Sequence, residues 1–97
     1  MAALKEMVKE EKERLLRMKD FYLEKIKELP KGSIIFKNRK ARKYPYLIYR
    51  DGQLVKTDYL KININELKEL STKINKRRKY LKMLREIKKD LKDFQKI

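Results

Sequence analysis

Apolar residues recur at intervals of three and four over two long stretches of this 97-residue chain. This spacing aligns them on one face of an α-helix, so the sequence predicts two long amphipathic helices, at residues 3–29 and 64–96. Pro30 disfavours helical geometry in the residue before it and ends the first helix. Asn63 and Glu66 have the spacing of a capping box, which marks the start of the second helix.

The segment between the helices, residues 33–61, is rich in β-branched and aromatic residues and predicts a three-stranded β-meander. Asp51-Gly52 is a strong signal for a two-residue hairpin turn between the last two strands, so the meander is expected to be antiparallel. The predicted strands are residues 34–37, 44–50 and 53–61.

Pairing outward from the predicted turn places Ile48 opposite Val55, and the same register places Tyr44 opposite Tyr59. Pro45 cannot donate a hydrogen bond to a ladder, so the amide side of the second strand must be unpaired or bulged at this residue. In this register one face of the meander carries Tyr44, Tyr46, Ile48, Val55, Thr57 and Tyr59.

The predicted fold class is therefore α+β and mainly α. We expect two long antiparallel helices that form a coiled-coil hairpin and flank a small three-stranded antiparallel β-meander, within a single domain of residues 1–97. The apolar stripes are narrow, and a two-helix hairpin buries little surface. A homodimer that completes a four-helix bundle is therefore an alternative to the monomer.

Cysteine and histidine are both absent from the sequence. Their absence removes disulfides, thiolate and imidazole metal ligands, and the commonest general base near neutral pH. Only Asp51 and Asp58 among the carboxylates lie outside the predicted helices, and two glycines cannot build a phosphate loop. We expect a protein that is not an enzyme and has neither a metal site nor a cofactor.

The first residues alternate apolar side chains with charged ones such as Lys5 and Glu6. Neither a signal peptide nor a membrane span has this pattern. We expect a cytoplasmic protein without a membrane partner.

Lysine and arginine outnumber the acids by 29 to 14, and the formal net charge is +15. The positive charge lies away from the first helix, because residues 1–29 hold eight bases and seven acids. Residues 30–62 hold nine bases and two acids, and residues 63–97 hold twelve and five. Charge of this sign and size favours an anionic partner such as nucleic acid.

Most basic residues of the meander lie in the predicted loop between its first two strands, beside two tyrosines. Cations next to aromatic rings suit a nucleic-acid backbone and its unstacked bases. The alternative is that the loop is a solvated tip and that the tyrosines pack as core, which is the usual role of strand aromatics. The candidate binding residues of the meander are Lys37, Arg39, Lys40, Arg42, Lys43, Tyr44, Tyr46, Arg50 and Lys56.

A second basic surface is predicted on the second helix, where bases recur at steps of three and four residues beside the apolar stripe. Such a stripe can follow phosphates along a groove, or it can be an ordinary polar face of a lysine-rich helix. The candidate binding residues of this stripe are Arg78, Lys82, Arg85 and Lys89.

Three segments, residues 29–34 (LPKGSI), 44–52 (YPYLIYRDG) and 55–60 (VKTDYL), resemble small helix–β-meander–helix proteins of bacteria and their phages or other mobile elements. Pro45 stands where that family is expected to have an aromatic residue. The resemblance implies the architecture and a mobile-element setting, and it implies no activity.

Two hypotheses for the function follow from these observations. In the first, the chain is a non-enzymatic protein that binds RNA or DNA directly through the basic meander and the helix stripe. In the second, it is a phage or mobile-element inhibitor, similar to anti-CRISPR proteins, that docks on a host nucleic-acid enzyme or ribonucleoprotein. The sequence contains no base-recognition motif that separates RNA from DNA.

Overall fold

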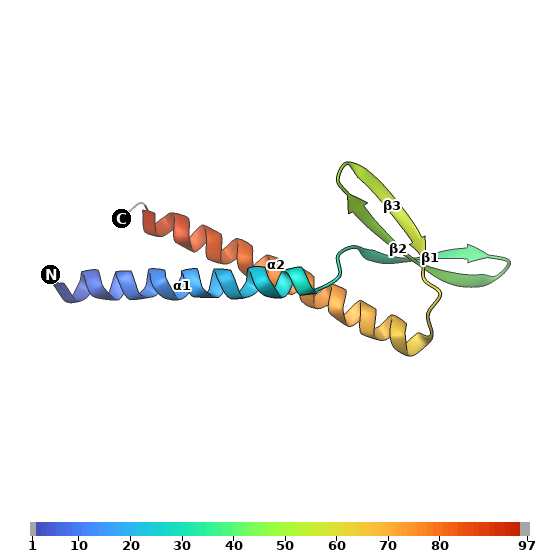
Figure 1. Cartoon of the computed structure of the whole chain (residues 1–97), viewed down its shortest axis with the longest axis horizontal. Coiled ribbons are helices and arrows are strands. Elements are labelled where there is room, and N and C mark those ends of the chain that lie inside the picture. The colour runs from blue at the N-terminus through green and yellow to red at the C-terminus, as the bar shows by residue number, and fades with distance from the viewer. Residues whose placement is uncertain (1, 96–97) are drawn as a thin grey trace. The chain divides into compact units, whose positions relative to one another are not determined.

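The computed structural model describes residues 2–95 of the chain. It confirms the predicted α+β class, which is mainly helical, with a three-stranded antiparallel sheet between two long helices in chain order. The bounds of the first helix lie within one residue of the predicted ones, and the predicted end of the second, Lys96, lies outside the described residues. The elements are α1 (Ala2–Glu28), β1 (Ser33–Arg39), β2 (Arg42–Asp51), β3 (Leu54–Tyr59) and α2 (Ile64–Gln95) (Figure 1).

The described chain divides into two compact units, and the first contains α1 and the part of α2 from Arg77 onward. These helical segments run antiparallel (Figure 1), and the rings of Tyr22 and Tyr80 lie 5.3 Å apart between centroids. Met7 and Phe21 on α1 are 66% and 53% exposed, so this helix has accessible apolar side chains. The homodimer stays a prediction. Among the residues of this unit whose burial is described, the buried side chains are Leu15, Ile26, Leu84 and Ile87. In the described part of the chain, neither helix has an apolar stretch long enough to cross a membrane.

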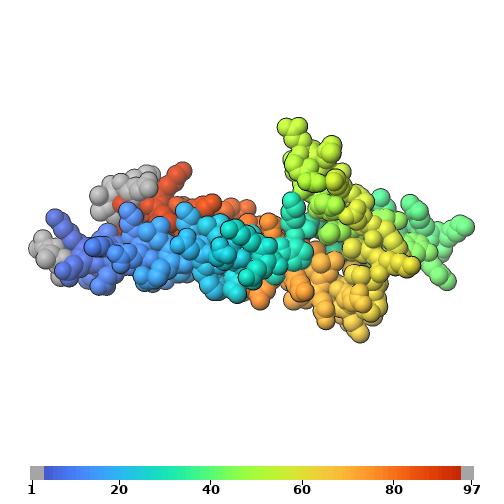
Figure 2. Space-filling view, viewed as in Figure 1, coloured from blue at the N-terminus to red at the C-terminus, as the bar shows by residue number. Residues whose placement is uncertain are grey.

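The second unit, Leu29–Lys76, contains the sheet and the first turns of α2. Strand β2 is central and pairs antiparallel with β1 through its first part and with β3 through its last part. All three strands lie side by side only over residues 46–48, and beyond that overlap each hairpin continues alone. The two hairpin ends accordingly project as separate arms of this unit (Figures 1 and 2).

The connection between β1 and β2 is a two-residue turn, and the prediction of a longer basic loop is wrong. Strand pairing continues to Arg39 opposite Arg42, so most of the basic residues lie on paired strands. Lys40 and Ala41 form the turn with φ values of 49° and 66°. Positive φ at both central residues is the geometry of a type I′ turn, which matches the twist of the flanking strands.

The second turn consists of Gly52 and Gln53, because Asp51 pairs with Leu54. Of the described residues from 42 to 59, only Gly52 has positive φ, at 62°, as a type II′ turn requires at its first central position. The predicted register is therefore wrong by two residues, and Tyr59 lies opposite Tyr46. Because the shift is even, every side chain keeps its predicted face.

Pro45 lies in register with Phe36 without a bulge, although it is in the central strand. Its carbonyl accepts a hydrogen bond from the Leu60 amide at 3.0 Å, so its backbone groups point toward β3. In an antiparallel ladder the opposite side of such a residue needs no amide hydrogen bond. The predicted bulge does not occur, and the side of Pro45 that lacks a donor is hydrogen-bonded through its carbonyl just beyond the end of β3.

The predicted cap of α2 is confirmed. The Asn63 side-chain oxygen accepts a hydrogen bond from the Glu66 amide at 2.8 Å, and its side-chain nitrogen donates to the Glu66 carboxylate at 2.9 Å. Ile74 is the only buried side chain of the described residues 29–76. The sheet therefore has no buried core residue of its own, and both of its faces are accessible in part.

Candidate nucleic-acid interface

Alternation along the paired strands gives the sheet two faces of different chemistry. We call the first the tyrosine face, and its members are Ser33, Ile35, Lys37, Arg39, Arg42, Tyr44, Tyr46, Ile48, Arg50, Val55, Thr57 and Tyr59. We call the second the ion-pair face, and its members are Ile34, Phe36, Asn38, Lys43, Pro45, Leu47, Tyr49, Asp51, Leu54, Lys56 and Asp58.

The tyrosine face has only positive charge. Among the paired residues of the described strands it carries four bases, Lys37, Arg39, Arg42 and Arg50, and no acid. All four side chains are exposed. Unneutralised positive charge on an accessible surface attracts polyanions.

The ion-pair face holds both acids of the meander. The Lys56 ammonium lies 2.8 Å from the Asp51 carboxylate, which neutralises this base. The Tyr49 hydroxyl donates a hydrogen bond to Asp58 at 2.9 Å, and this bond holds the pKa of Tyr49 above its usual value. Lys43 is the other base of this face. The two faces therefore differ in net charge although they belong to the same strands.

Tyr44, Tyr46 and Tyr59 form an aromatic cluster at the centre of the tyrosine face. The ring centroids of Tyr46 and Tyr59 are 5.4 Å apart, and those of Tyr44 and Tyr59 are 6.1 Å apart. The Lys37 ammonium lies 4.7 Å from the Tyr46 ring centroid, within the range of a cation–π interaction. Tyr59 is 50% exposed and the other two tyrosines are half-buried, so none of the three is a fully buried core residue.

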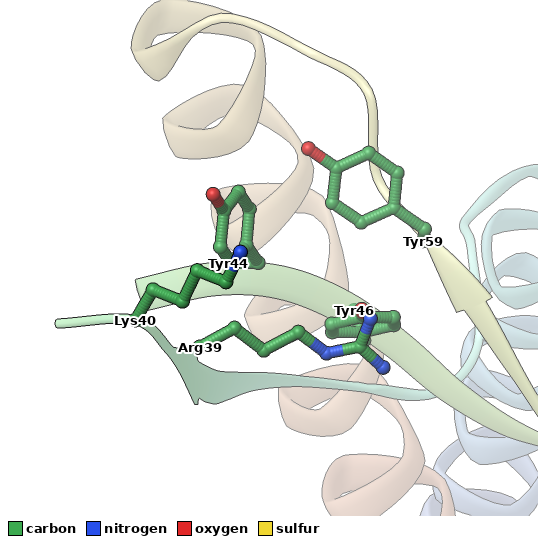
Figure 3. Close-up of a pocket in the computed structure, with 5 residues that line it drawn as sticks. All are labelled: Arg39, Lys40, Tyr44, Tyr46 and Tyr59. Atoms are coloured by element: carbon green, nitrogen blue, oxygen red, sulfur yellow. The ribbon is translucent and has the colours of Figure 1, made fainter. Parts of the chain in front are cut away.

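A pocket of about 410 Å³ separates this cluster from the β1–β2 turn. Arg39 at the end of β1 and Lys40 in the turn extend toward the rings, and Tyr59 lines the pocket from β3 (Figure 3). The volume lies within the range of about 300–1,000 Å³ that is typical of small-molecule pockets. The pocket is open to solvent, so part of a long polymer can enter it.

The β1–β2 hairpin end contains two features that cost stability. Arg39 and Arg42 are directly opposite each other, and like charges in such a cross-strand pair repel. Lys40 and Ala41 have left-handed backbone geometry, which costs about 1–2 kcal/mol for a residue with a Cβ atom. Local costs of this kind are frequent where a segment has a binding role.

The structure separates the predicted meander residues into two groups. Five of them share the tyrosine face: Lys37, Arg39, Arg42, Tyr44 and Tyr46. Of these, Arg39, Tyr44 and Tyr46 line the pocket, as does Lys40 in the turn. Arg50 shares the face but lies toward the other hairpin end, opposite Val55.

Lys43 and Lys56 lie on the ion-pair face and point away from the pocket side of the sheet. Sequence reasoning did not include Tyr59 among the binding residues. The strand alternation already placed it on the face of Tyr44 and Tyr46, and this was the signal that could have found it.

The predicted stripe on α2 belongs to the other compact unit. Its four side chains, Arg78, Lys82, Arg85 and Lys89, are exposed. They form a second basic surface, which lies on the helical unit.

Comparison with known protein families, with curated proteins and with solved structures found no match to this chain. The candidate interface therefore depends on the chemistry of the sheet alone.

Proposed function

We propose that this protein is a non-enzymatic nucleic-acid-binding protein whose tyrosine face contacts the polymer. The observation that carries the proposal is the separation of charge between the two faces of one small sheet. Both acids of the meander lie on the ion-pair face, and four bases lie on the other face without an acid. A phosphate backbone is bound by positive charge that no neighbouring acid neutralises, and the tyrosine face provides such a surface.

The tyrosine cluster supports nucleic acid over other polyanions. A purely electrostatic partner requires only cations, and exposed aromatic rings add nothing to its binding. Nucleic acids have both phosphates for Arg39 and Arg42 and aromatic bases for the tyrosine rings. An anionic lipid surface would instead require an apolar face with a rim of bases, as in interfacial helices.

The test compares two double variants that remove the same number of positive charges. Arg39→Gln/Arg42→Gln changes the tyrosine face, and Lys43→Gln/Lys56→Gln changes the ion-pair face. We expect the first to weaken binding of a fluorescent oligonucleotide at least about tenfold, because charge-assisted hydrogen bonds are lost. The slope of the logarithm of affinity against the logarithm of salt concentration should decrease by roughly 1.5. The matched control should bind as the parent does.

A third variant neutralises Arg78, Lys82, Arg85 and Lys89 on α2. If this variant loses binding while the Arg39→Gln/Arg42→Gln variant keeps it, the tyrosine face is not the interface. If the parent protein binds no RNA or DNA even at low salt, the proposal of direct binding fails. That result would favour the inhibitor hypothesis, in which the same face docks on a nucleic-acid-handling protein.

A further inference from the structure

The rings of the tyrosine face are placed where they can contact a ligand. Tyr59 is 50% exposed, and a pocket of about 410 Å³ lies open beside it, lined by the three rings and by Arg39 and Lys40. Figure 3 shows Tyr44 and Tyr59 at the two sides of this opening. The rings contact one another at centroid distances of 5.4 and 6.1 Å, and half of Tyr59 still remains accessible to a ligand.

Duplex and unpaired nucleic acid differ in what they offer to these rings. In a duplex the flat surfaces of the bases are covered by the neighbouring base pairs, and only base edges and phosphates are accessible. In a single strand a base can leave the stack and place its flat surface against an aromatic side chain. Cations alone would bind both forms, so the rings are the feature that discriminates.

We propose that the tyrosine face binds single-stranded nucleic acid in preference to duplex, with one unstacked base in the pocket that the three tyrosine rings line together with Arg39 and Lys40. This inference rests on the proposed function and adds the class of nucleic acid to it. Arg39 and Lys40 line the same pocket and are the partners of the phosphates that flank the inserted base.

The three rings have different roles in this arrangement. The Lys37 ammonium already lies 4.7 Å from the centre of the Tyr46 ring and occupies one of its sides. Tyr46 therefore lines the pocket while Lys37 covers part of its ring. Tyr59 is the most accessible ring and comes from a different strand, so it is the ring on which the base stacks.

The experiment uses the full chain and a mixed-sequence DNA strand of about 12 nucleotides, a length within the site sizes of aromatic stacking surfaces. Its RNA equivalent and the annealed duplexes are measured at the same salt concentration. The parent should bind the single strands more tightly than the duplexes. Tyr59→Leu should weaken single-strand binding about 5- to 150-fold, because stacking of one base is lost. Duplex affinity should not change.

Two further variants control for loss of structure. Tyr59→Phe keeps the ring and should retain the preference for single strands. Tyr49→Leu makes the same change as the test variant on the ion-pair face and should bind as the parent does. Circular dichroism and the melting temperature of each variant verify that the fold persists.

The results separate this inference from the proposed function. Equal affinity for single strand and duplex, with no effect of Tyr59→Leu but a loss in Arg39→Gln/Arg42→Gln, overturns the inference and leaves the proposed function standing. A loss in Tyr59→Phe as large as in Tyr59→Leu also overturns the inference, because the ring would not be the group used. Absence of binding to every nucleic acid at low salt overturns both.

Discussion

Replacing Gly32 with alanine tests how the chain enters the sheet. Gly32 has a φ of 118°, which residues with a Cβ atom rarely adopt. A Cβ at this position would lie 2.8 Å from the carbonyl oxygen of Ile48 and 3.2 Å from the Cβ of Tyr49. The first contact involves the backbone of the central strand, so it cannot be relieved by rotating a side chain.

Two costs add up in Gly32→Ala. The left-handed backbone costs about 1–2 kcal/mol, and forcing a group into a filled site costs about 1–3 kcal/mol more. Alanine also lowers the conformational entropy of the unfolded chain, which offsets about 0.4–1 kcal/mol of this loss of stability. The free energy of unfolding should therefore fall by about 1–4.5 kcal/mol in urea denaturation.

Gly52→Ala is the matched control. Gly52 also has positive φ, at 62°, but a Cβ there would meet no atom within 4 Å. Only the backbone cost applies, so we expect a loss of about 1 kcal/mol. If the two variants lose the same stability, or if Gly32→Ala loses less, the close approach of Gly32 to β2 does not contribute and the reasoning is wrong.

Three smaller changes test other parts of the second unit. Ala41→Gly should raise the free energy of unfolding by about 0.5–1 kcal/mol in urea denaturation, because the relief of left-handed backbone strain exceeds the entropy cost of glycine. A loss of stability would contradict the turn geometry. Asn63→Ala should lower the melting temperature through a loss of about 1 kcal/mol, because the Glu66 amide loses its cap; an unchanged value would exclude that role. Asp58→Ala should lower the pKa of Tyr49 toward its ordinary value in an alkaline ultraviolet titration, because the hydrogen bond to Asp58 holds it raised. The stability that this hydrogen bond adds to the parent protein is present below the ordinary tyrosine pKa and is lost as the pH rises through the raised pKa of Tyr49. A pKa of Tyr49 that stays the same in Asp58→Ala would refute this reasoning.

The helix boundaries were predictable because local chemistry determines them. Pro30 restricts the geometry of its predecessor, and Asn63 with Glu66 satisfies the free amides at the start of α2. The faces of the sheet were also predictable, because side-chain alternation survives an even error in register. The tyrosine face is therefore largely a property of the sequence pattern.

Both turns were harder to predict. Asp-Gly suits the two central positions of a type I′ turn, but the chain places Gly52 first in a type II′ turn and uses Asp51 as a strand residue paired with Leu54. Lys40-Ala41 has no turn signature at all, because neither residue favours positive φ. The pairing of β1 with β2 on both sides of the turn imposes the positive φ values. A short sequence window does not contain this information, because it depends on contacts between strands. The pocket, which depends on both the short turn and the position of Tyr59, could not be predicted for the same reason.

The central claim is that the tyrosine face contacts nucleic acid, and the six tyrosines of the chain allow a direct measurement. Tyrosine-specific isotope labelling gives one set of ring signals for each residue in nuclear magnetic resonance. During titration with a single-stranded oligonucleotide, the ring signals of Tyr44, Tyr46 and Tyr59 should shift together. Those of Tyr49 on the ion-pair face and of the Tyr22–Tyr80 pair in the helical unit should stay in place. Shifts confined to the second group, with the first unchanged at saturation, would contradict the account.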